Sequence, residues 1–180
     1  CTACPLHKNR TLAVPGDGSA DAQVMIIGEA PGQEEDRTGL PFVGRSGKLL
    51  TELLESVGIH RKDIFITNTV KCRPEHNRKP ELEEMACCKE LWLDKQIAVL
   101  QPPVIVLVGN TALQSVLGRT GVTALHGKTI QKEGQMYFIT FHPSAALRFT
   151  QTKELMRQDF VQLKNVIEGM KKQVRLDRFK

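Results

Sequence analysis

The stretch IIGEAPGQEEDRTGLPFVG, from Ile26 to Gly44, begins as a buried strand and continues as a long polar loop. Beyond Gly28 it contains three further glycines, two prolines, four acidic residues and one phenylalanine. Glycines allow the backbone to bend sharply and to approach a bound molecule closely. We interpret the stretch as a central strand that ends in a ligand-binding loop.

Three more apolar runs resemble this strand, because they are short, rich in β-branched residues and almost uninterrupted. Together the four predicted strands are QVMIIG (23–28), IFITNTV (64–70), PVIVLVG (103–109) and YFITF (137–141). Continuous apolar runs are typical of strands that are covered on both faces. Helical patterns alternate with them, at residues 46–58, 80–100, 111–118 and 152–173. We therefore predict an α/β fold of three layers, α/β/α, with a central, mainly parallel sheet of four strands.

The size and composition fit a single domain over residues 1–180. Hydrophobic residues make up 41% of the chain, and no apolar run approaches the roughly 20 residues that a membrane span needs. The N-terminus lacks the basic and then apolar pattern of an export signal, so we expect a cytoplasmic protein. Lysine and arginine outnumber the acids by 25 to 20, a formal charge of +5, which permits a polyanionic partner without requiring one.

Three of the four predicted strands run directly into polar loops that contain glycine or proline, at residues 28–44, 71–80 and 142–148. In open parallel sheets, ligands bind beyond the carboxyl ends of the strands. We therefore expect the three loops to converge on one crevice. The glycine spacing of the first loop matches neither a dinucleotide fingerprint nor a P-loop.

Four side chains near these strand ends could contribute to chemistry. Glu29 is the first side chain after the first strand, where a catalytic group would be held rigidly, but it could equally cap a helix or pair with a lysine. Phe42 could stack on a flat ligand or anchor the loop in the core. Asn68 could recognise a base edge, because an amide both donates and accepts, or could be a buried structural residue. His142 is the best candidate among five histidines for charge stabilisation or proton transfer.

Two residues are predicted to cap helices. Asn110 precedes the helical pattern at 111–118, and Ser144 could cap a short helix that runs through Arg148. Arg148 would then be available to contact a phosphate group, or it would be an ordinary surface charge.

Five cysteines, an odd number, fit a metal site in a reducing compartment better than a set of disulfides. Cys1 and Cys4 form a Cys-x-x-Cys pair, Cys72 lies in the second loop, and Cys87 and Cys88 lie in the following helix. Four thiolates in this pattern can hold zinc or an iron–sulfur cluster, and their spacing does not decide between the two. Adjacent helical residues point about 100° apart, so we expect only one of Cys87 and Cys88 to face the metal.

With these features together, the sequence closely resembles the iron–sulfur (family 4) uracil-DNA glycosylases over nearly the whole chain. The resemblance rests on the cysteine pattern and on GEAPGQEEDRTGLPFVG (28–44), ITNTVKCRPEHNRKP (66–80) and FHPSAALR (141–148). It implies a uracil-DNA glycosylase-like fold and an enzyme that flips uracil out of DNA and hydrolyses its N-glycosidic bond, which leaves an abasic site. The expected substrates are single- and double-stranded DNA that contain uracil, and the expected state is a monomer.

The resemblance also implies roles for particular residues. Glu29 would orient the attacking water, and His142 would stabilise the charge that develops on uracil O2. Uracil would be bound by Ala30, Gly32, Phe42, Asn68 and Asn77, with Phe42 stacking on the ring and Asn68 reading its edge. DNA would be contacted by Ser144 and Arg148, on a loop that enters the minor groove.

A [4Fe–4S] cluster is the cofactor that the resemblance implies, with zinc as the alternative. Its ligands would be Cys1, Cys4, Cys72 and Cys88. They lie in the N-terminal segment and in residues 72–88, which together we call the cysteine lobe of a single glycosylase domain. One departure from the family pattern is the segment KELWLDKQI after Cys88, which is about one residue longer than expected.

Other functions fit some of these features. A non-catalytic iron–sulfur nucleic-acid-binding or sensor module would keep the cluster and the pocket, but it would need neither Glu29 nor His142. A zinc-bound α/β hydrolase or transferase would act on small nucleotides. A related group captures abasic DNA covalently through a histidine, and His76 lies in the corresponding loop, although the cysteine and the spacing here are those of the glycosylases.

Overall fold

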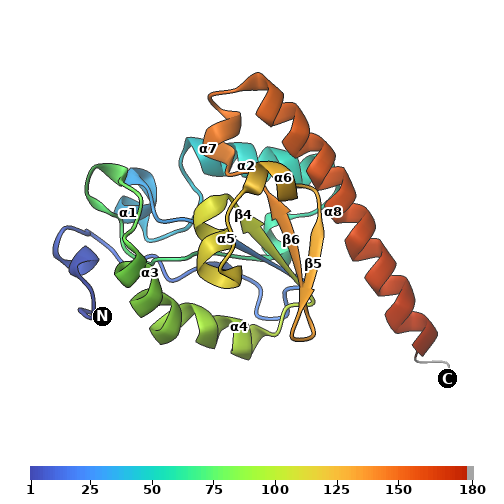
Figure 1. Cartoon of the computed structure of the whole chain (residues 1–180), viewed down its shortest axis with the longest axis horizontal. Helices are drawn as coiled ribbons and strands as arrows, with labels where there is room; N and C mark the ends of the chain where they lie inside the picture. The colour runs from blue at the N-terminus through green and yellow to red at the C-terminus, as the bar shows by residue number, and fades with distance from the viewer. Residues whose placement is uncertain (178–180) are drawn as a thin grey trace.

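The computed structural model describes residues 1–177, and its centre is a six-stranded sheet in the order β1-β3-β2-β4-β6-β5 (Figure 1). The four central strands are parallel and are those predicted from the sequence: β2 (Val24–Gly28), β3 (Phe65–Asn68), β4 (Val104–Val108) and β6 (Gln135–Thr140). The sheet has two strands more than expected, because an antiparallel strand is added at each edge: β1 (Asp17–Gly18) and β5 (Thr129–Lys132). β1 and β5 are mostly exposed, and neither contains an apolar run from which the sequence analysis could have predicted a strand.

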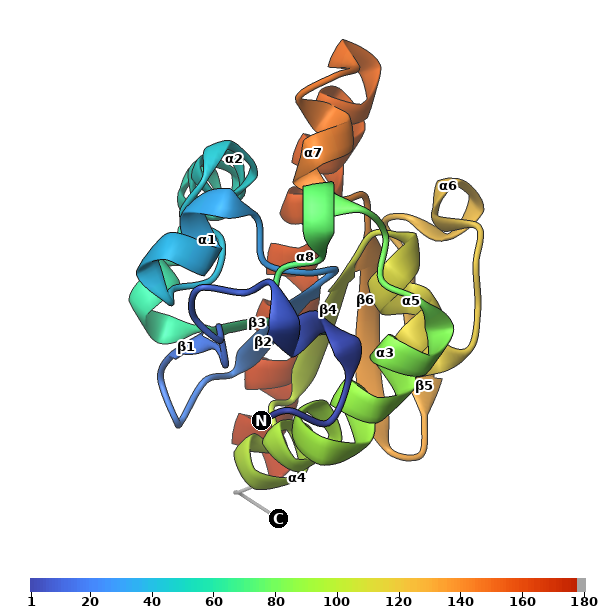
Figure 2. The ribbon, with the colours of Figure 1, turned by 90° about the vertical axis from the view of Figure 1, so that its left-hand side faces the viewer.

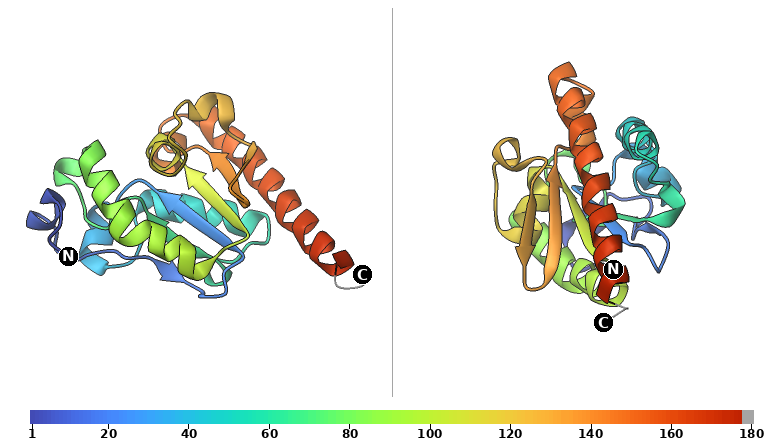
Figure 3. Two further views of the ribbon diagram at one scale, coloured as in Figure 1. Left: turned by 60° about the horizontal axis from the view of Figure 1, so that its bottom comes forward. Right: turned by 90° about the vertical axis from the view of Figure 1, so that its right-hand side faces the viewer.

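Helices cover both faces of the sheet, which confirms the predicted three-layer architecture (Figures 2 and 3). One face carries α2 (Arg45–Ser56) and the long α8 (Thr150–Asp177), which contact each other. The other face carries α3 (Leu82–Cys88), α4 (Asp94–Leu100) and α5 (Asn110–Leu117). The remaining helical segments are short: η1 (Pro5–Lys8), α1 (Gln33–Thr38), η2 (Arg61–Asp63), η3 (Glu75–Asn77), α6 (Val122–Leu125) and α7 (Pro143–Ala146). Within residues 1–177, no helix has both the length and the apolar character that crossing a membrane requires.

The main core lies between these layers. β2 and β4 are buried along all five of their residues, as their uninterrupted apolar sequences predicted. α2 adds a stripe of buried leucines at helical spacing: Leu49, Leu50, Leu53 and Leu54. Fully burying a leucine side chain contributes about 1.5–3 kcal/mol, so this stripe holds α2 firmly against the sheet. It thereby also holds the end of the glycine-rich loop that leads into α2.

The helix predicted at residues 80–100 is present, but it contains a wider turn. α3 ends at Cys88, a π-helical turn (η4) spans Lys89–Leu93, and α4 continues from Asp94. A π turn closes its hydrogen bonds over five residues instead of four, so it takes up one additional residue. The turn lies within KELWLDKQI, the segment expected to be about one residue longer than the family pattern, and Leu93 in it is buried.

A second, smaller core lies beside the first. It consists of buried residues from η1, from the loop that follows β3, and from α3: Leu6, Val70, Cys72, Met85 and Cys88. The N-terminal segment therefore packs against residues 72–88 (Figure 2).

The close contact between α2 and the loop before it gives a test of the fold. A Cβ atom at Gly47 would lie 1.9 Å from the Phe42 carbonyl oxygen, and backbone there cannot move without displacing the Phe42 ring. We expect Gly47→Ala to lower the free energy of unfolding by about 1–3 kcal/mol, as overpacking does. Gly169→Ala, at an exposed helical position with no atom within 4 Å, should raise it by about 0.5–1 kcal/mol. Equal effects of the two substitutions in urea unfolding would contradict the described packing.

Candidate active site

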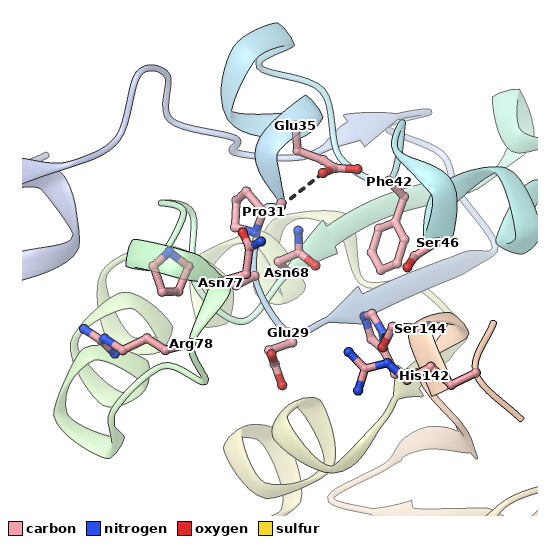
Figure 4. Close-up of a pocket in the computed structure, with 14 residues that line it drawn as sticks. Glu29, Pro31, Glu35, Phe42, Ser46, Asn68, Asn77, Arg78, His142 and Ser144 are labelled. Carbon is pink, nitrogen blue, oxygen red and sulfur yellow. Dashed lines mark hydrogen bonds between the residues drawn. The ribbon is translucent and has the colours of Figure 1, made fainter. Parts of the chain in front are cut away.

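A cavity of about 410 Å³ opens beyond the carboxyl ends of the parallel strands (Figure 4). Its lining residues are Glu29, Ala30, Pro31, Gly32, Glu35, Phe42, Ser46, Asn68, Pro74, Asn77, Arg78, His142, Ser144 and Arg148. The three loops predicted to converge do so, and every predicted site residue other than the cysteines lies in this lining. Their roles remain predictions, but their convergence is a property of the fold.

The register of the sheet explains why these side chains meet. Gly28 of β2 is paired with Asn68 of β3, so Glu29 leaves its strand at the level where Asn68 ends the neighbouring one. β6 is paired with β4 up to Thr140, and His142 follows two residues later. Parallel strands end at the same edge of a sheet, so the carboxylate, the amide and the imidazole face one space.

Gly28 is required where the ring and the amide come together. A Cβ atom there would lie 2.4 Å from the Phe42 ring and 2.5 Å from Asn68 Oδ1. Phe42 itself has a φ of 51°, a left-handed conformation that a bulky residue adopts only when its surroundings impose it. Arg61 imposes it by donating hydrogen bonds to the carbonyl oxygens of Pro41 and Phe42. Phe42 belongs to the main core, which confirms that it anchors the loop, and it also lines the cavity, while its stacking on a ligand stays a prediction.

Glu35 organises the rest of the loop, although no pattern in the sequence singles it out. Its carboxylate accepts the backbone N–H of Gly32 at 3.0 Å and those of Val43 and Gly44 at 2.8 Å each. Because the acceptor is a buried carboxylate, these hydrogen bonds are stronger than those between neutral groups. They join the start of the loop to its end and keep Phe42 beside the strand.

Asn68 has an unused acceptor. The residue is 1% exposed, and its Oδ1 atom is buried without a hydrogen bond from any residue in the described part of the chain. An unsatisfied buried acceptor costs about 1–3 kcal/mol, so its presence in a cavity wall indicates a ligand that donates there. The backbone carbonyl oxygen of Asn68 accepts a hydrogen bond from Lys71 Nζ at 2.7 Å. Burial lowers the pKa of Lys71 to about 7.

His142 is oriented by the turn that follows it. Its Nδ1 accepts the backbone N–H of Ser144 at 3.2 Å and lies 2.7 Å from Ser144 Oγ. His142 therefore caps α7, whereas we had expected Ser144 to do so. Burial lowers the pKa of His142 from its ordinary value of 6.5, although the charges of Glu29 and Glu35 oppose this. With Nδ1 used as an acceptor, the neutral ring has its proton on Nε2.

Glu29 contacts a residue that the sequence analysis missed. Its Oε2 atom accepts a hydrogen bond from the Thr111 hydroxyl, in the first turn of α5. No loop follows β4, so nothing in the sequence marked this strand end as part of the site. The predicted cap of α5 is also wrong: Gly109 occupies that position, and Asn110 Oδ1 instead accepts the backbone N–H groups of Gly121 and Val122.

The second loop presents polar groups at the rim. Asn77, with a left-handed φ of 56°, lines the cavity and accepts a hydrogen bond from Arg73 Nε at 2.8 Å. Arg78 is held by Glu84 through two hydrogen bonds. His76 is almost fully exposed and is absent from the cavity lining, so its position gives no support to covalent capture.

The cysteines surround a separate, mainly apolar cavity of about 200 Å³. It is lined by all five of them together with Ala3, His7, Arg10, Ala13, Pro15, Lys71, Leu91 and Trp92. Both Cys87 and Cys88 line this cavity, so the expectation that only one of them faces the metal stays a prediction. Cys87 approaches from the side of the N-terminal segment, where its Sγ lies 3.7 Å from the Ala3 carbonyl oxygen, and Cys88 is buried beside the backbone of Lys71.

The donor set of this second cavity suits a thiolate-bound group. Burial raises the pKa of Cys88, and the charge and backbone N–H of Lys71 lower it. Arg10 donates a hydrogen bond to Cys72 Sγ at 2.9 Å. Among the described side chains of residues 1–170, no three of His, Cys, Asp or Glu are grouped closely enough to hold a single metal ion.

Comparison with known proteins identifies the family to which this fold belongs. The model of the uracil DNA glycosylase superfamily matches residues 15–164, and the chain belongs to that superfamily. It is 49% identical to the type-4 uracil-DNA glycosylase of Thermotoga maritima, over 87% of this chain and 82% of the relative. It is 39% identical to the type-4 uracil-DNA glycosylase of Sulfurisphaera tokodaii, over 92% and 80%, and 41% identical to that of Archaeoglobus fulgidus, over 89% and 84%. The predicted family is therefore confirmed.

The state of His142 can be measured directly. We expect NMR titration to give a midpoint below 6.5 and a ring protonated on Nε2 at pH 7. Since the folded pKa is lowered, the unfolded chain takes up this proton first as the pH falls. The stability contributed by the neutral ring is therefore complete above about pH 6.5 and is lost at lower pH. A midpoint above 6.5, or a proton on Nδ1 in the neutral ring, would contradict the described environment.

Proposed function

We propose that the chain is a DNA repair enzyme, a uracil-DNA glycosylase that flips uracil out of DNA and hydrolyses its N-glycosidic bond. The observation that supports this most strongly is the unpaired Oδ1 of Asn68 in the cavity shared by Glu29 and a neutral His142. Membership of the uracil DNA glycosylase superfamily supports the same function.

The flipped base would be recognised by stacking and by its edge. Uracil lies within a base stack in duplex DNA, so it has to be extruded before the enzyme reaches its bond to the sugar. Phe42 offers a ring face, and Ala30 and Gly32 are small enough to leave room for the base. Asn68 Oδ1 would accept the N3–H of uracil, and its amide nitrogen would donate to O4. Cytosine presents the opposite pattern, an acceptor at N3 and a donor at N4.

Cleavage would use the carboxylate and the imidazole on opposite sides of the breaking bond. As the bond between C1′ and N1 lengthens, its electrons move onto uracil and the sugar becomes positively charged. The Nε2–H of His142 donates a hydrogen bond to O2 of the departing uracil anion. Glu29 stabilises the positive sugar, orients water towards C1′ and accepts its proton. The products are an abasic site and the uracil anion, which takes up a proton from solvent while Glu29 releases its own.

The DNA strand would lie across the rim of the cavity. Arg148, Ser144 and Asn77 all line the cavity, so they would contact the phosphates and sugars that flank the flipped nucleotide. The formal charge of +5 favours a polyanion, and binding should weaken steeply as salt rises. Uracil in single strands and in duplexes would both be substrates, for a monomeric enzyme acting in the cytoplasm.

Cys1, Cys4, Cys72 and Cys88 would hold a [4Fe–4S] cluster, with Cys87 as the spare thiol. Cys72 and Cys88 are buried in the small core, Cys4 packs against it, and Cys1 is exposed but lines the same cavity. Thiolates are the ligands such clusters require, and when bound the cluster would cross-link the N-terminal segment to α3. Residues 1–180 would then act as a single glycosylase domain with the cysteine lobe attached to it.

Single-turnover cleavage tests the catalytic roles. We expect Glu29→Gln and His142→Gln to cleave a uracil-containing oligonucleotide about 10²–10³ times more slowly, because each removes one stabilising group of the transition state. DNA affinity should stay close to that of the wild type. Glu55→Gln and His60→Gln, at exposed positions, are the matched controls.

The oligonucleotide carries one uracil, thymine replaces it in the control strand, and alkali reveals the abasic sites. Unchanged rates in both variants would refute the roles of Glu29 and His142. Binding without cleavage by the wild type would instead favour the non-catalytic sensor module.

The choice of the fourth cluster ligand is tested by two neighbouring substitutions. We expect Cys87→Ser to keep the iron, the sulfide and the brown absorbance of the wild type, whereas Cys88→Ser loses them, because Cys88 is the buried thiol. The metal content of anaerobically purified protein gives the answer. The reverse pattern would make Cys87 the ligand, and a colourless protein with stoichiometric zinc would refute the cluster.

A further inference from the structure

We propose that Thr111 is a positioning residue for the reaction, whose hydroxyl holds the Glu29 carboxylate in its working orientation. This inference rests on the proposed role of Glu29. It adds the end of a fourth strand, β4, to a site that the sequence analysis built from three strand ends.

The contact between the two side chains is specific. Thr111 Oγ1 donates a hydrogen bond to Glu29 Oε2, across 82 positions of the chain. Among the side chains that the structure describes, those of residues 1–170, it is the only donor within hydrogen-bond distance of that carboxylate, and Oε1 has no partner among them. One carboxylate oxygen is thus tied to the protein, and the other remains available to a water molecule.

Thr111 acts from behind the site. It is 3% exposed and does not line the cavity, so it can affect the substrate only through Glu29. It lies in the first turn of α5, where the partial positive charge of the helix terminus also favours the carboxylate. A glutamate has three rotatable bonds, and without this hydrogen bond it would sample several rotamers at the end of β2.

The turn that carries Thr111 is itself rigid. Gly109 has a φ of 91°, and its N–H donates to the Thr140 carbonyl oxygen at 2.9 Å. A Cβ atom at Gly109 would lie 2.9 Å from the Cβ of His142. Asn110 fastens the same turn to the start of α6. One three-residue turn therefore packs against His142 and bonds to Glu29, which sets the separation between the two proposed catalytic side chains.

Removing only the hydroxyl isolates this contribution. We expect Thr111→Val to lower the single-turnover cleavage rate about 10–100-fold, since small displacements of a catalytic group can cost about 100-fold. DNA affinity should change less than about twofold, because the hydroxyl touches no DNA. Thr111→Ser, which keeps the hydroxyl, should restore most of the rate. Thermal unfolding of each variant shows whether the fold is intact.

A double-mutant cycle separates positioning from a general structural effect. In the Glu29→Gln background, Thr111→Val should cause little further loss, because the group it positions is already disabled. A Thr111→Val variant that cleaves at the wild-type rate would overturn the inference, as would equal losses in the Thr111→Val and Thr111→Ser variants. Full additivity of the two losses would overturn it as well. If Glu29→Gln alone cleaves normally, the failure lies with the proposed function of Glu29 and not with Thr111.

Discussion

The parallel pairing of the four central strands is the constraint on which the rest of the structure depends. The pairing of Gly28 with Asn68 puts the ends of β2 and β3 at one level, and the pairing of Val108 with Thr140 does the same for β4 and β6. A shift of one residue along any strand would turn its last side chain to the opposite face of the sheet. The carboxylate, amide and imidazole therefore share a cavity because the hydrophobic core allows only one register.

The groups around the cavity are held in place before any ligand binds. Glu35 closes the glycine-rich loop with three backbone hydrogen bonds, and Arg61 holds the carbonyl groups next to the Phe42 ring. His142 is oriented by Ser144, and Glu29 by Thr111. Such preorganisation lowers the reorganisation that a reaction would otherwise require at the moment of bond breaking. Asn68 Oδ1 is a fully buried acceptor in the wall of this cavity without a hydrogen bond from any residue described, which fits a site that is completed by its ligand.

Much of the fold could be predicted, because the central strands and α2 bury apolar side chains at regular spacing. β1 and β5 could not, because edge strands with exposed side chains have no apolar pattern to detect. The candidate site residues could be predicted where a polar side chain directly follows an apolar run, as Glu29 and His142 do. Thr111 could not, because its partner is 82 positions away and only the folded chain brings them together. The orientation of Cys87 and Cys88 depends on where the N-terminal segment packs, which helical geometry alone does not determine.

A structure of the Glu29→Gln variant bound to DNA that contains one uracil tests the central claim most directly. The account predicts an extruded uracil beside Phe42, with its N3–H donated to Asn68 Oδ1 and its O2 facing Nε2 of His142. A uracil that remains stacked in the DNA, or that lies outside the cavity with Asn68 Oδ1 still unpaired, would contradict it.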